Sequence, residues 1–157
     1  MTSPSENEQQ VWFLNTLVTM RVPSSAGKDG ISILEHRAPY GDTPPLHVHK
    51  TEDEIFHIIA GTFRFKVGEE EKTLHAGEMH LMPKGVPHSY RVESKEGGHW
   101  MTITAHGDFE KLVRAVSRPA ERPELPAPSG PPTEQEMKSL AEAAARVGID
   151  IVGPPLH

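Results

Sequence analysis

The feature that most constrains the fold of this chain is a run of short, strand-like segments separated by glycine and proline, from residue 11 to residue 106. Within residues 62–67, apolar Phe63 and Phe65 alternate with polar neighbours, which is the pattern of a strand with one buried face. The 13 glycines and 15 prolines favour frequent turns and disfavour long helices. Several short strands at this spacing predict an all-β sandwich or barrel.

Composition divides the chain into four parts. They are a polar N-terminus expected to be disordered (1–10), a β-barrel (11–117), a proline-rich arm (118–132) and a C-terminal helix with an apolar tail (133–157). Thr133 followed by Glu136 is a capping-box pattern that predicts the start of the helix, and Gly148 predicts its end. The tail after Gly148 is apolar enough to dock either on the barrel or on a partner subunit.

Several classes of function are disfavoured by charge and composition. The net charge of −6 argues against a nucleic-acid or anionic membrane surface. No apolar run could span a bilayer, and the segment MTSPSENEQQ lacks the regions of a signal peptide, so we expect a cytoplasmic protein. The absence of cysteine excludes disulfides, thiolate metal ligands and a cysteine nucleophile.

Three of the ten histidines and one acidic residue stand out as candidate metal ligands. His47 and His49 are two residues apart, so on an extended strand both imidazoles project to the same face. Glu54 begins the next apolar strand, and His88 follows a turn rich in proline and glycine. Nitrogen and carboxylate donors that converge in this way predict a site for a first-row metal ion.

These residues resemble the two signature motifs of the cupin superfamily. The first motif, G-x5-H-x-H-x4-E-x6-G, is matched by Gly41, His47, His49, Glu54 and Gly61. The second motif, G-x5-P-x-G-x2-H, is matched by Gly77, Pro83, Gly85 and His88. The family often has Asn four residues after the last histidine, where this chain has Val92, which bears on pocket polarity and not on metal binding.

The resemblance implies a cupin fold, which is a double-stranded β-helix (jelly-roll) barrel, here followed by a C-terminal helix. It implies that His47, His49, Glu54 and His88 hold the metal. Beyond the motifs, the chain is similar to bacterial single-domain cupins related to quercetinase, the flavonol 2,4-dioxygenase. That likeness covers nearly all of the chain after residue 10 and says little about the substrate.

Three functions fit such a centre. The first is a quercetinase-like dioxygenase acting on a small oxygenated compound, aromatic or not. In it Glu54 is the catalytic carboxylate that takes a proton from the substrate. The others are a cupin isomerase or lyase that uses the metal as a Lewis acid, and a non-enzymatic cupin that binds a small ligand or a metal. Imidazole and carboxylate ligands suit one divalent ion of Fe, Mn, Ni, Co, Cu or Zn without choosing among them.

The remaining histidines and apolar residues have more ordinary predicted places. His57 is out of phase with Glu54 and is expected at the surface or at a subunit contact. Solvated or partly exposed positions are expected for His36, His75 and His157, and structural or surface roles for His80 and His99. Alternation predicts an inner face made of Phe63, Phe65, Met79, Leu81, Met101 and Ile103.

The arm and the apolar tail predict a homodimer, because both could wrap a partner subunit and cover a sheet edge. The mass of the protein in solution checks this prediction. A value of twice the chain mass is expected, and a monomeric mass would contradict it.

Overall fold

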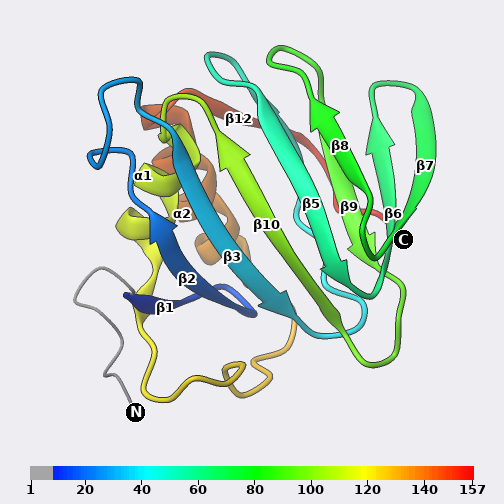
Figure 1. Ribbon diagram of the computed structural model, residues 1–157. Helices are drawn as coiled ribbons and strands as arrows, with labels where there is room; N and C mark the ends of the chain where they lie inside the picture. Colours follow the sequence, from blue (N-terminus) through cyan, green and yellow to red (C-terminus); the bar gives the residue numbers. More distant parts are fainter. Residues whose placement is uncertain (1–8) are drawn as a thin grey trace.

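Two antiparallel β-sheets face one another, and two helices lie beside them at one end (Figure 1). The computed structural model describes residues 9–157. The first sheet has the order β11-β1-β2-β3-β10-β5-β8. Its strands are β1 (Gln10–Phe13), β2 (Thr16–Val22), β3 (Ser32–Ala38), β5 (Glu54–Ala60), β8 (Met79–Met82), β10 (Gly98–Thr104) and β11 (Arg118–Pro119).

The second sheet has the order β12-β4-β9-β6-β7. Its strands are β4 (Leu46–His49), β6 (Thr62–Val67), β7 (Glu70–His75), β9 (His88–Val92) and β12 (Ile149–Gly153). The helices are α1 (Asp108–Val116) and α2 (Glu134–Arg146). The predicted all-β architecture with a C-terminal helix is therefore confirmed, and neither helix of residues 9–157 is long and apolar enough to cross a bilayer.

The apolar core has two parts. Between the sheets, Phe63 and Phe65 are fully buried, as predicted, and pack with the rings of Phe56, Tyr90 and Trp100. Where the helices lie, α1 and α2 pack on the inner face of β1, β2 and β3. That second part contains Val11, Phe13, Val18, Met20, Leu34, Leu112, Val113, Leu140, Ala144 and Ile149.

The C-terminal segment folds onto its own chain. The capping box predicted at Thr133 and Glu136 is confirmed, since each residue's side chain bonds the other's backbone N–H. After α2, strand β12 pairs with β4, and Ile149 and Ile151 lie opposite His49 and His47. The sequence left two docking places for the tail, the barrel or a partner subunit. In the structure the tail docks on the barrel of its own chain.

The arm also contacts the first sheet. Strand β11 pairs with β1, and the guanidinium groups of Arg118 and Arg122 lie over the ring of Trp12. The indole N–H of Trp12 donates to the carbonyl of Glu124. Of the segment predicted to be disordered, residues 1–8 lie outside the described residues, and Gln10 is the first residue of β1. The homodimer stays a prediction.

Two expectations from the sequence are wrong: the inward position of four apolar strand residues, and the number of helices. Met79 and Leu81 are 60% and 46% exposed, and Met101 and Ile103 lie with them on the outer face of the first sheet. Strict alternation does not say which of its two faces is inside, and here both faces carry apolar residues. The sequence pattern predicted a single helix, near the C-terminus, whereas the structure also contains helix α1.

His36 is buried instead of solvated. It is 2% exposed, because Leu34 and Ala38 on the same side of β3 also point inward. Its ring stacks on Trp100 with centroids 4.8 Å apart, and its Nε2 lies 3.0 Å from Thr102 Oγ1. Burial lowers the pKa of His36 to about 4, against the raising effect of Glu54 and Glu35.

This depressed pKa predicts an acid-sensitive fold. His36 of the unfolded chain becomes protonated below pH 6.5, whereas in the folded chain it stays neutral down to about pH 4. The free energy of unfolding therefore decreases as the pH falls through this window. The full loss is about 3 kcal/mol. Urea unfolding of metal-free protein at pH 7 and pH 4 measures it, with His36→Phe as the variant that cannot titrate. Equal losses in the two proteins would contradict the prediction.

Candidate metal centre

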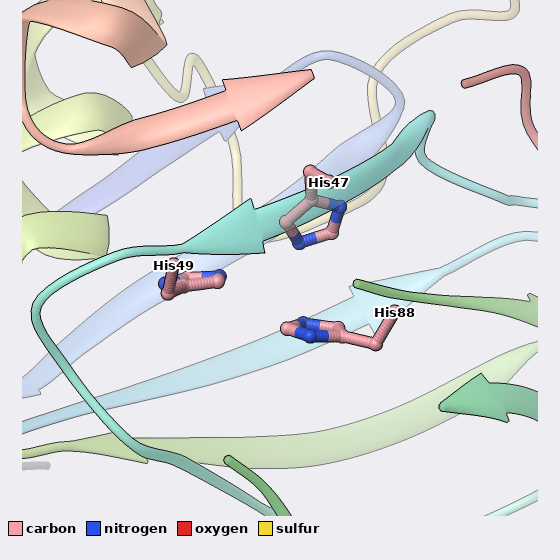
Figure 2. Close-up of side chains that lie close together, drawn as sticks. All are labelled: His47, His49 and His88. Atoms are coloured by element: carbon pink, nitrogen blue, oxygen red, sulfur yellow. The ribbon is translucent and has the colours of Figure 1, made fainter. Parts of the chain in front are cut away.

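Three imidazoles meet between the two sheets (Figure 2). His47 and His49 come from β4, where the strand period of two turns both toward the interior, and His88 is the first residue of β9. The backbones of β4 and β9 pair at His47 and His88. One ring nitrogen of each histidine lies within 4.8 Å of the others, so three of the four predicted ligands form one cluster.

Hydrogen bonds fix the tautomer of two of these rings. His47 Nδ1 lies 2.7 Å from the carbonyl oxygen of Pro45, and His49 Nδ1 lies 3.3 Å from Glu52 Oε1. A carbonyl and a carboxylate only accept, so each Nδ1 carries the proton and donates it. When these rings are neutral, the Nε2 atoms of His47 and His49 therefore keep the lone pairs that can bind a metal.

Glu54, the first residue of β5, lies beside two of the rings. Its Oε1 is 3.4 Å from His88 Nε2, and its Oε2 is 3.9 Å from His49 Nε2. The side chain is 3% exposed, so water does not screen it. The structure thus brings the predicted carboxylate next to the triad, and its role as a fourth ligand stays a prediction.

The buried nitrogens fit a bound cation. His49 Nε2 and both ring nitrogens of His88 are buried without a hydrogen-bond partner. A buried polar atom left in this state costs about 1–3 kcal/mol. A divalent ion would satisfy one nitrogen of each ring, and imidazole donors without thiolate suit first-row metals. The donor set of this site therefore fits a transition-metal ion.

The charged forms of the site follow from its neighbours. Burial raises the pKa of Glu54, but His49, His88 and His47 outweigh it and lower that pKa to about 2. Burial and the nearby His88 and His49 lower the pKa of His47 to about 3. Burial also acts to lower the pKa of His49, but Glu54 and Glu52 raise it overall. Glu54 is thus an anion and His47 is neutral at physiological pH.

A largely apolar pocket reaches this cluster. His47 and Glu54 belong to its lining, which otherwise comes from both sheets and both helices. Aromatic rings dominate the walls, namely Phe13, Phe56, Tyr90, Trp100 and Phe109. Neither His80 nor His99 lines it, and His99 Nε2 is hydrogen-bonded to Glu35 Oε1 at 2.6 Å elsewhere.

Several pocket residues were missed by the sequence reasoning. His36 lines the pocket together with Thr102. The sequence signal for His36 was the alternation that buries Leu34 and Ala38 on either side of it. Phe109 and Leu112 enter from α1, and their spacing of three residues was the helical signal available.

Comparison with known proteins agrees with this architecture. Residues 34–104 match the family model of the cupin domain. The chain is 31% identical over 112 residues to quercetin 2,3-dioxygenase of Bacillus subtilis (strain 168), which covers 71% of this chain and 32% of that protein. The chain thus spans about a third of the length of that relative.

Solved structures share the fold at low sequence identity. A predicted oxalate decarboxylase from Thermotoga maritima superposes with a TM-score of 0.60 and 18% identity, over 68% of this chain and 99% of that one. A variant of Bacillus subtilis oxalate decarboxylase superposes with a TM-score of 0.58 and 19% identity, over 72% of this chain and 33% of that one. KdgF from Halomonas sp. superposes with a TM-score of 0.56 and 14% identity, over 69% of this chain and 96% of that one.

The two facing sheets, the inward histidine triad and the family match over residues 34–104 agree with one another. Residues 34–104 form a cupin domain, and the chain has the cupin fold.

Proposed function

We propose that this protein is a metal-dependent oxygenase of the quercetinase type that acts on a small, flat, oxygenated compound. The observation that carries the proposal is that a buried triad with unpaired nitrogens adjoins a pocket walled by aromatic rings. The resemblance to a quercetin 2,3-dioxygenase supports it.

The metal would be held by His47, His49 and His88, with Glu54 as the fourth ligand. A divalent ion in this place supplies Lewis-acid chemistry, which lowers the pKa of a hydroxyl group on the substrate. The three histidines and the carboxylate suit Fe, Mn, Ni, Co, Cu or Zn, and we propose one such ion per chain.

The walls of the pocket favour an aromatic substrate over a sugar. A sugar needs many hydrogen-bond partners, whereas Phe13, Phe56 and Phe109 offer ring faces and edges. Among the lining residues, polar side-chain atoms come from His36, His47, Glu54, Tyr90, Trp100 and Thr102. A flat compound with a few oxygens matches this arrangement, and the apolar walls would keep water away from it.

Glu54 is the proposed catalytic base. It is the carboxylate among the residues that line the pocket, and it lies on the triad side of that pocket. A hydroxyl of the substrate bound near the triad would give its proton to a carboxylate oxygen of Glu54, which would have to loosen from the metal to accept it. General-base catalysis of this kind contributes about 10²–10⁴-fold to a rate.

The proposed ligands predict a selective loss of metal. Replacing His47, His49 or His88 by alanine removes one donor and is expected to weaken metal binding by more than about 100-fold. Elemental analysis of protein purified without added metal measures this loss and also identifies the native ion. His57→Ala is the matched control, because His57 lies on the outer face of β5 opposite Met79 and Met101. Equal metal content in all four variants would contradict the assignment.

Oxygen uptake tests the proposed activity. Protein reconstituted with each of the six metals is mixed with flavonols, β-diketones and hydroxyquinones, and dissolved oxygen is followed with an electrode. We expect uptake with at least one metal and one class, and none with His88→Ala. Turnover without oxygen would favour the isomerase or lyase, and tight binding with no product by mass spectrometry would favour a non-enzymatic ligand-binding cupin. Either result would overturn the oxygenase proposal.

A further inference from the structure

We propose that Glu52 is a positioning residue that links the metal-binding imidazole of His49 to the start of helix α1. One buried carboxylate would then hold both the donor nitrogen of the triad and a wall of the pocket. The inference rests on the metal binding proposed above. It adds a residue that the cupin motifs in this chain do not include.

The contacts of Glu52 carry the inference. The residue lies between β4 and β5, and its side chain is fully buried. Oε1 lies 3.3 Å from His49 Nδ1 and accepts the backbone N–H of Phe109 at 2.8 Å. Oε2 accepts the backbone N–H of Asp108 at 3.0 Å. The carboxylate therefore has three donors from two parts of the chain that are more than 50 residues apart.

Helix α1 needs this carboxylate because it cannot cap itself. Its N-cap residue is Gly107, which has no side chain and makes no capping hydrogen bond. The position requires glycine, since φ is 76° and a Cβ atom would lie 2.6 Å from Ser24 Cβ. The first N–H groups of a helix need acceptors, and a negative charge there also suits the helix dipole. Glu52 supplies both from a distant segment.

The same carboxylate sets which nitrogen of His49 faces the triad. By accepting the Nδ1 proton it leaves the lone pair on Nε2, which is buried without a hydrogen-bond partner on the side of Glu54. A side chain without an acceptor at this place would release that preference. A ring protonated on Nε2 presents a hydrogen instead of a donor pair to the metal.

Helix α1 transmits the link to the pocket. Phe109, whose N–H is held by Glu52, packs its ring edge to face against His49 with centroids 6.2 Å apart. The same ring lies 5.8 Å from that of His36, and Phe109 and Leu112 both line the pocket. A hydrogen bond from Thr51 to the side chain of Asp108 adds a second tie beside the first. Metal binding and order at the start of α1 are thus coupled, and such coupling is reciprocal.

A matched pair of variants separates positioning from plain stabilisation. Glu52→Gln keeps the shape but turns one acceptor oxygen into a donor. Glu110→Gln is the control, because Glu110 is also buried on α1, where it accepts from Ser24 N and Ser32 Oγ and pairs with Arg114. No contact joins Glu110 to the triad among the interactions described for residues 9–157.

Two measurements decide the question. Calorimetric titration with Co(II) measures the affinity for the metal ion. We expect this affinity to be about 10–100-fold weaker in Glu52→Gln and unchanged within about threefold in Glu110→Gln. Glu52→Leu has no acceptor and is the variant for the tautomer. Nitrogen NMR of metal-free protein, at a pH where the ring of His49 is neutral, is expected to show its proton on Nδ1 in the wild type and in Glu110→Gln, and to show this preference lost in Glu52→Leu. Equal affinities, or the wild-type tautomer in Glu52→Leu, would overturn the inference.

Two features keep the test independent. The tautomer is read without metal, so if the wild-type protein bound no metal the proposed function would fail while the role of Glu52 in orienting His49 could still be decided. If either Glu52 variant did not fold, hydrogen exchange of the wild type would replace it. Slower exchange of the Asp108 and Phe109 amides on adding Co(II) is then the expected result, and unchanged exchange would overturn the coupling.

Discussion

The convergence of three imidazoles and a carboxylate inside an apolar core is the constraint on which the rest of the structure depends. Buried polar groups are expensive unless each atom finds a partner, and here three ring nitrogens have none. The surrounding chain meets the other needs of these rings, with the Pro45 carbonyl for one Nδ1 and Glu52 for another. A cation bound by one open nitrogen of each ring would remove part of this cost.

The strand that carries two of these rings is held mainly from the side of the C-terminus. β4 pairs with β9 at a single position, His47 with His88, whereas β12 pairs with it from Leu46 to His49. Ile149 and Ile151 of β12 also line the pocket. The tail is thus part of the support of the site, which explains why it is apolar. Its backbone places the H-x-H segment, and its side chains close the pocket.

The sequence predicted those parts of the site that depend on local periodicity. A period of two sets His47 beside His49, and a capping box starts α2, because both rules involve residues within four positions. The sequence-based prediction failed where contacts between distant residues determine the structure. Met79 and Leu81 alternate as well as Phe63 and Phe65 do, and only the packing of whole sheets turned one pair outward. Helix α1 takes its cap from Glu52, so no capping residue marks its start in the sequence.

Two acidic residues flank His49, and geometry gives them different roles. Glu52 faces Nδ1 and is saturated by three donors, so its oxygens are committed to holding the ring and the helix. Glu54 faces Nε2 at 3.9 Å, lies near His88 and lines the pocket, so its oxygens are the ones within reach of a metal or a substrate. A single residue separates them in sequence, yet the turn before β5 sends them to opposite sides of one imidazole. Glu52 therefore holds the ring of His49 and the start of α1, while Glu54 faces the pocket.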